Sequence, residues 1–160
     1  MRTLGRGELE KVAPHVEYEI EAMLCAHKQY GATHDRLILE AFLIHVRCLH
    51  EFFTQPRKQD TDVRAQNYFE FESDWTGACP PMPDVFNRDE MVERLNRRVT
   101  HLSTDRARWF ERERTENWAW PTQDLETAIL DYSRAFLLNM PSDRKEWFKS
   151  LPALLGTPGT

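Results

Sequence analysis

The sequence predicts an all-α fold, a bundle of four or five helices. Apolar residues recur at spacings of three and four along most of the chain, which is the period of an amphipathic helix. The segment 37–53 is apolar on almost every side, so we expect it to be buried centrally or sandwiched between subunits. No stretch shows the strict alternation of apolar and polar residues that is typical of strands.

Length and composition exclude several classes of protein. The 160 residues suit one helical domain over 1–160, with a core over about 14–140 and a frayed end at 151–160. A net charge of −5 argues against a protein that coats nucleic acid nonspecifically. No apolar run reaches about 18 residues, so neither a transmembrane helix nor a membrane partner is expected. The N-terminus lacks the apolar core of a secretion signal. Three cysteines without CxxC spacing indicate reduced thiols, and we expect a cytoplasmic protein.

Two long helices are predicted in the first third of the chain. Pro14 suits a first helical turn, so we expect a helix over 14–30. Thr33 or Asp35 can cap the next helix, over about 35–53. The acidic residues of the first helix are interpreted as solvated, with contact to a later arginine-rich segment as the alternative. These residues are Glu17, Glu19 and Glu21.

The middle of the chain is less regular. Aromatic residues followed by glycine and prolines predict a short helix or turn over 63–70, then a surface loop whose aromatics pack on the bundle. Asn87 and Glu90 have the spacing of a capping box. Apolar residues at helical spacing follow, so a helix is expected over about 88–103.

Helical patterns continue towards the C-terminus. We expect a further helical stretch over about 104–116, a long helix over about 123–139 and a short helix over 143–150. Pro141 ends the long helix because proline cannot continue one. Ser142 can cap the short helix that follows.

Ionisable residues on the apolar helix 35–53 form the first candidate site. Glu40 and Arg47 share one face two turns apart, whereas His45 lies on the apolar face. His45 and His50 point in different directions and cannot chelate one ion together. Charges in such a helix need partners. The pattern leaves two interpretations open, a buried Glu–Arg contact with a satisfied core histidine, or a polar network that holds a site.

A basic cluster in the segment 94–106 forms the second candidate site. Its members at helical spacing are Arg94, Arg97, Arg98 and His101. A positive patch that contains a titratable imidazole suits a phosphate group, and Asp105 can orient the ring. The alternative is a solvated basic helix face with the histidine at its edge.

Several common catalytic motifs are absent. No histidine follows a glutamate by three residues, which excludes the usual di-iron bundle, and no two histidines are four apart, which excludes a zinc-protease helix. Neither a phosphate-binding glycine loop nor a Gly-x-Ser-x-Gly motif occurs. We therefore expect neither a metal nor a cofactor.

Two spaced patterns resemble those of a family of uncharacterised small bacterial helical proteins. The patterns are Glu40-x4-His45-x-Arg47 and, about fifty residues later, Asn96-x4-His101-Leu102-x3-Arg106. That family resembles the HEPN superfamily (higher eukaryote and prokaryote nucleotide-binding). The resemblance covers roughly residues 15–140. It implies a bundle of four or five helices, a homodimer, and in many members a metal-independent ribonuclease of toxin–antitoxin or phage-defence systems.

The sequence departs from the catalytic signature of those nucleases, an arginine generally followed by a polar residue, with a histidine after four to six intervening positions. Arg94 precedes His101 by six intervening residues, but Leu95 follows the arginine. At the other motif Cys48 follows Arg47, where relatives often have asparagine. The departures bear on catalysis more than on the fold.

Two main hypotheses for function follow from the resemblance. In the first, a ribonuclease, His101 is the general acid/base and Arg94, with Arg97 or Arg98, stabilises charge on the phosphorane. In the second, the chain is a noncatalytic binding or regulatory module that contacts RNA or an antitoxin-like protein. Under the second hypothesis a Glu40–Arg47–His101 cluster fixes the helix register.

A supporting polar cluster accompanies either hypothesis. Its members are Glu40, His45, Arg47, Asn96, Asp105 and Arg106. A third, separate interpretation is a nucleotide pocket walled by Trp109, Trp118 and Trp120, because aromatic rings stack on bases.

Overall fold

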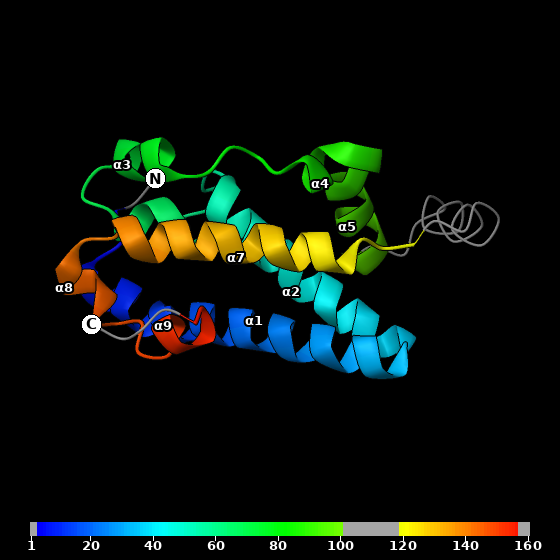
Figure 1. The fold of residues 1–160 in the computed structure, drawn as a ribbon. Helices are drawn as coiled ribbons and strands as arrows, with labels where there is room; N and C mark the ends of the chain where they lie inside the picture. The colour runs from blue at the N-terminus through cyan, green and yellow to red at the C-terminus, as the bar shows by residue number, and fades with distance from the viewer. Residues whose placement is uncertain (1–2, 101–118, 157–160) are drawn as a thin grey trace.

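The structure, a computed structural model, describes residues 3–100 and 119–156, without the side chains of residues 89 and 97–100. These residues form helices and connecting turns, and no strand occurs among them, so the predicted all-α class is confirmed. The helices of ten or more residues in the described ranges are α1 (Arg6–Thr33), α2 (Arg36–Thr54), α5 (Met91–Thr100) and α7 (Thr122–Asn139). In Figure 1, α4 and α5 lie at one end of α7, and α3 and α8 lie at the other.

Helix α1 is longer than the pattern predicted, because it begins at Arg6 rather than near Pro14. The Glu8 carboxylate accepts a hydrogen bond from the backbone N–H of Gly5 at 2.9 Å. This bond satisfies one of the backbone donors that have no partner within the helix at its N-terminus. Leu9 and the residues that follow one helical turn later are buried against the rest of the bundle, so tertiary packing holds the added turns. The helix ends at Thr33, and the next residue, His34, has a φ of 53° in the left-handed region.

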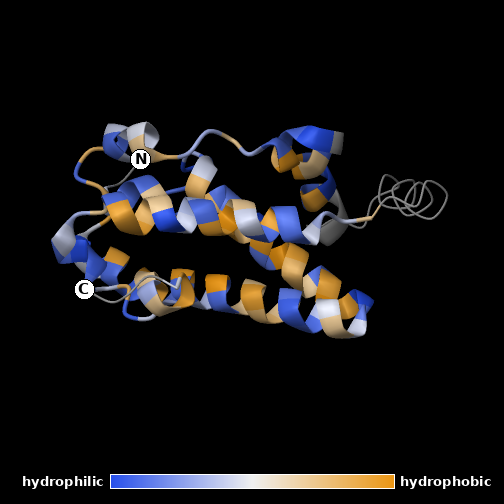
Figure 2. Cartoon of the chain, viewed as in Figure 1, coloured by the Kyte–Doolittle hydropathy of each residue, from blue (hydrophilic) through white to orange (hydrophobic). Residues whose placement is uncertain are grey.

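Helix α2 follows α1 after a tight turn and packs obliquely against it (Figure 1). Its predicted start is confirmed, since the Asp35 carboxylate accepts a hydrogen bond from the N–H of Leu37 at 2.7 Å. Figure 2 shows apolar residues along much of α2, and four of them have at most 1 % of their surface exposed. This helix is therefore central, as its apolar sequence predicted.

An aromatic cluster packs where α2 meets α7. Phe136 of α7 is fully buried at its centre. The rings within about 6 Å of it belong to Phe52, Phe53, Tyr68, Phe69, Trp75 and Phe148. Their polar atoms are satisfied too: Trp75 donates to the carbonyl of Phe53 at 2.8 Å, and Tyr68 donates to the carbonyl of Leu9 at 3.0 Å.

The stretch after α2 contains more helix than the predicted surface loop. The short helix expected over 63–70 is present as the 3₁₀ turn η1 (Ala65–Tyr68). Two further short helices follow, α3 (Glu72–Ala78) and α4 (Asp84–Asn87). The buried indole of Trp75 anchors α3, which explains why glycine and proline spacing alone did not reveal it.

The predicted capping box at Asn87 is wrong. Asn87 has helical backbone angles and makes no capping hydrogen bond, and it precedes the 3₁₀ turn η2 (Arg88–Glu90). Glu90 has a φ of 54°, a left-handed conformation that costs a non-glycine residue about 1–2 kcal/mol. Glu90 ends η2 and α5 begins at the next residue, so the helix expected over 88–103 is broken near its start. Met91 and Leu95 are buried, as their spacing predicted.

The C-terminal region is ordered further than expected. Helices α8 (Ser142–Lys145) and α9 (Leu151–Leu154) follow α7, and Leu151 and Leu155 belong to the core. The carboxylate of Glu17, on α1, accepts hydrogen bonds from the backbone N–H groups of Ser150 and of Leu151, the latter at 2.8 Å. The interpretation of Glu17 as solvated is therefore wrong. It caps the N-terminus of α9, where a negative charge is favourable.

Candidate functional site

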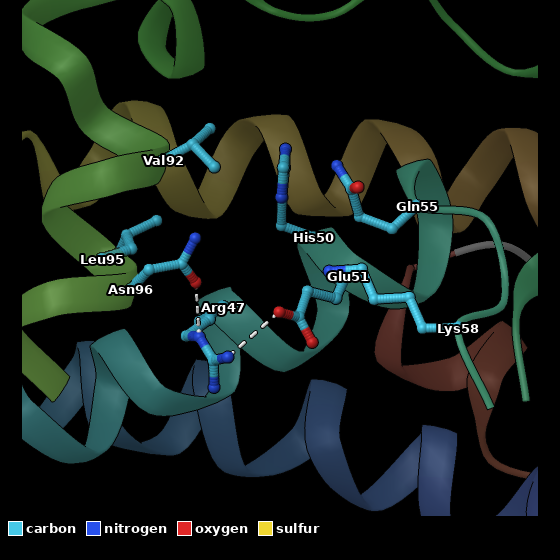
Figure 3. Close-up of a pocket in the computed structure, with 8 residues that line it drawn as sticks. All are labelled: Arg47, His50, Glu51, Gln55, Lys58, Val92, Leu95 and Asn96. Carbon is cyan, nitrogen blue, oxygen red and sulfur yellow. Dashed lines mark hydrogen bonds and ion pairs between the residues drawn. The ribbon is translucent and has the colours of Figure 1, made fainter. Parts of the chain in front are cut away.

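The structure brings together one residue from each of the two spaced sequence patterns. Arg47 on α2 donates from Nε to the side-chain oxygen of Asn96 on α5 at 2.7 Å. The same guanidinium donates from Nη2 to Oε1 of Glu51, one helical turn further along α2, at 3.0 Å. Arg47 is thus held in one orientation by two bonds, and it joins α2 to α5 at the point where the patterns meet (Figure 3).

A polar pocket opens beside this junction. Its volume is about 130 Å³. The residues that line it come from α2, from the loop after α2 and from α5: Arg47, His50, Glu51, Gln55, Lys58, Val92, Leu95 and Asn96. One side is apolar and the other carries charged groups and amides, so the pocket combines a surface for ring contact with hydrogen-bonding groups.

His50 is the most deeply buried ionisable group of this pocket, with 3 % of its surface exposed. Its ring packs against Phe86 of α4, with the ring centres 4.3 Å apart. Burial lowers the pKa of His50 from 6.5 to about 4, because removal from water disfavours the charged imidazolium. The imidazole is therefore neutral at pH 7 and contributes a flat, uncharged ring to the pocket wall.

The buried His50 is expected to make the folded state sensitive to acid. The unfolded chain takes up this proton near pH 6.5 but the folded chain only near pH 4, so between these values the unfolded state binds more protons. The stability that depends on neutral His50 is present above pH 6.5 and is lost as the pH falls towards 4. At about 1.4 kcal/mol per pH unit, the free energy of unfolding falls by about 2 kcal/mol between pH 6.5 and 5 through this residue.

The measurement is urea denaturation of the wild type and of His50→Leu at pH 6.5 and pH 5. Other titrating groups contribute equally to both proteins, so the difference between the two pH dependences isolates residue 50. The wild type should lose about 2 kcal/mol more than the variant. Equal losses in the two proteins would show that the pKa of His50 is the same in the folded and the unfolded state.

Arg94, a predicted charge-stabilising residue, lies in the interior. It has 1 % of its surface exposed, and its guanidinium carbon stands 3.8 Å from the centre of the Trp120 ring. This distance is typical of a cation–π contact. Arg94 therefore connects α5 to the segment that leads into α7, and its guanidinium is not presented to solvent.

Two other predicted residues have partners of their own. Glu40 pairs with Arg36, one turn earlier on α2, at 3.4 Å. His45 contacts Glu19 of α1, with Nδ1 and Oε2 2.7 Å apart. Glu19 is therefore a partner of α2 rather than a solvated acid. Glu40 and Arg47, which share a face, do not share a partner among the described residues.

The rest of the predicted site lies outside the described residues. This applies to the whole of His101, Asp105 and Arg106, to two of the three tryptophans and to the stretch expected over 104–116. The tryptophans are Trp109 and Trp118. The backbone of Arg97 and Arg98 belongs to α5, but their side chains are not among those described.

Sequence reasoning missed several residues of the pocket. The sequence assigns no role to His50, because it cannot chelate an ion together with His45. Gln55 and Lys58 lie near the end of α2 and beyond it, where no pattern marked them. One signal was available, since Glu51 follows Arg47 by four residues, the spacing at which helical side chains form ion pairs.

Two further observations concern the described residues as a whole. They contain no group of three or more histidine, cysteine or acidic residues placed to hold a metal ion. None of their helices is both long enough and apolar enough to cross a membrane. In the comparisons with known proteins, no family model, no curated protein and no solved structure matches this chain.

Proposed function

We propose that this protein is an HEPN-like helical module that binds single-stranded RNA at the junction of α2 and α5, without cleaving it. The observation that carries the proposal is the Arg47–Asn96 hydrogen bond. It joins the two sequence patterns on which the resemblance depends, and it does so at the edge of a polar pocket. The proposal gives both patterns a common purpose, which is to build one binding site from two helices.

The chemistry of the junction supports binding better than catalysis. A general acid/base works best with a pKa near the operating pH, and the pKa of His50 is about 4. Arg94 is enclosed against Trp120 and is not directed at a substrate on the surface of this protomer. Arg47, in contrast, is partly exposed and held in place, which favours recognition because little conformational entropy is lost on binding.

Pairing of two copies through α2 is part of the proposal, because the resemblance implies a homodimer. Leu37 and Ile44 lie seven residues apart on α2, and both are exposed. Residues at this spacing share one helix face, so α2 presents apolar groups on its outer side. A second copy of the same face would cover them.

Fluorescence anisotropy with a labelled single-stranded RNA dodecamer of mixed sequence, at one fixed salt concentration, tests the binding. The wild type should bind, and Arg47→Met should weaken binding by about tenfold or more, since it removes a charge-assisted donor. Arg36→Met is the matched control, because Arg36 also pairs with a glutamate four residues away on α2 but lies outside the pocket. Light scattering on the same sample should give the mass of two chains.

Other outcomes of these measurements would contradict the proposal. If the wild type binds no RNA, or if Arg36→Met weakens binding as much as Arg47→Met, the proposed site is wrong. If the RNA is cut and His101→Ala abolishes the cutting, the protein is a ribonuclease and the noncatalytic proposal is replaced.

A further inference from the structure

We infer that the pocket between α2 and α5 receives a guanine base of the bound RNA. This inference rests on the proposed function and adds the identity of the group that enters the site. It depends on three features of the pocket, its size, the balance of its charges and the position of a carboxylate opposite an apolar wall.

The size of the pocket restricts the ligand to a part of a nucleotide. A cavity of about 150 Å³ holds a single benzene ring, and this pocket has about 130 Å³. It therefore takes the hydrogen-bonding ring of a base while the sugar and phosphate stay at the mouth. Recognition of single-stranded RNA commonly works in this way, with an unstacked base inserted into a pocket.

The charges inside the pocket favour a neutral ligand over an anion. The ion pair between Arg47 and Glu51, at 3.0 Å, already balances the guanidinium. A phosphate that entered the pocket would approach the Glu51 carboxylate, and like charges in a half-buried site repel each other. Lys58 also lines the pocket and is exposed. Its amine is the group suited to a phosphate, and it can contact the RNA backbone beside the inserted base.

The walls of the pocket suit a flat ring. Val92 and Leu95 of α5 form one wall, and Val92 is only partly buried, so a ligand that covers it removes apolar surface from water. His50 contributes its uncharged imidazole. Figure 3 shows the His50 ring between Val92 and Gln55.

The carboxylate selects guanine among the four RNA bases. The ion pair with Arg47 uses Oε1 of Glu51, and an ionised carboxylate has about four acceptor positions on its two oxygens. Guanine presents two N–H donors side by side, N1–H and the N2 amino group, which one carboxylate can accept together. Adenine, cytosine and uracil each place an acceptor beside their donor on the same edge, so each would direct a lone pair towards Glu51. The amide of Gln55 can donate to the guanine O6.

The test compares two RNA octamers, U8 and U3GU4, by fluorescence anisotropy with the full chain. The wild type should bind U3GU4 at least about tenfold more tightly than U8, because one well-placed pair of hydrogen bonds discriminates by this factor or more. Glu51→Gln should lose this preference, since an amide cannot accept two donors through both terminal atoms. Asp131→Asn should keep it, because Asp131 also pairs with an arginine on its own helix, Arg134 of α7, but does not line the pocket.

A second variant covers the case in which Glu51→Gln does not fold, which circular dichroism would reveal. Val92→Phe fills the pocket and leaves its charged groups in place, so it should abolish the preference for U3GU4 while U8 binding remains. Equal affinity of the wild type for the two octamers would overturn the guanine inference and leave RNA binding intact. Tighter binding of both octamers by Glu51→Gln would also overturn it, since the pocket would then hold a phosphate. No binding of either octamer would overturn the proposed function itself.

Discussion

Replacement of Phe136 by alanine is expected to lower the free energy of unfolding by about 3–5 kcal/mol, the usual cost of removing a phenyl ring from a well-packed core. Phe136 is fully buried. Its ring packs edge-on against residues of α2, η1, α3 and the segment after α8, among them Phe52, Tyr68, Trp75 and Phe148. Loss of this ring leaves a cavity that four separate segments would have to move to fill.

The effect is large compared with the 5–15 kcal/mol that typically stabilises a domain. Urea denaturation followed by circular dichroism measures it. Leu138→Ala is the control on the same helix, because Leu138 has 76 % of its surface exposed and should change the stability by no more than about 0.5 kcal/mol. Similar losses from the two substitutions would contradict the packing of α7 described above.

Arg94→Ala is expected to lower the free energy of unfolding by about 3 kcal/mol or more. Arg94 is among the largest fully buried side chains of the described residues. Its removal deletes a volume comparable to that of a buried methionine, which costs about 2–5 kcal/mol, and also deletes the cation–π contact with Trp120, worth about 1–2 kcal/mol when it is desolvated. The connection between α5 and the start of α7 should loosen as a result.

Thermal and urea denaturation of Arg94→Ala and Arg88→Ala together test this role. Arg88 also belongs to the segment before α7, but its ion pair with Asp124 is more than half exposed on both sides, and such pairs contribute about 0–1 kcal/mol. If Arg94→Ala were as stable as the wild type, the structural role would be contradicted. Arg94 would then again be a candidate catalytic residue.

The fold was predictable where local sequence decides the structure. Helix α2 combines an apolar sequence with an aspartate that caps its start, and both signals lie within the helix or next to it. The start of α1 and the helix α3 were not predictable in this way. Leu9 and Trp75 hold these turns through contacts with distant segments, and a one-dimensional pattern does not contain such contacts.

The candidate site was predictable only in part, for a similar reason. The spacing of Arg47 and Glu51 places them on one face of a helix, so their pairing follows from the sequence. The neutral state of His50 depends on burial and on contact with Phe86, which belongs to another helix. The enclosure of Arg94 depends on Trp120, which lies beyond a segment of more than twenty residues. Sequence spacing therefore predicted a catalytic role for Arg94, whereas in the fold its buried side chain joins two segments of the chain.

The link between Glu17 and the backbone of Ser150 has a consequence for the order of events on the ribosome. The two residues are 133 positions apart, and translation at about 5–20 residues per second needs roughly 7–27 s to cover that distance. Throughout that time the nascent α1 carries a carboxylate whose amide partners have not been made. The protein can complete its interior only after Ser150 and Leu151 have left the exit tunnel, so closure of the domain follows the synthesis of α1 with a long delay.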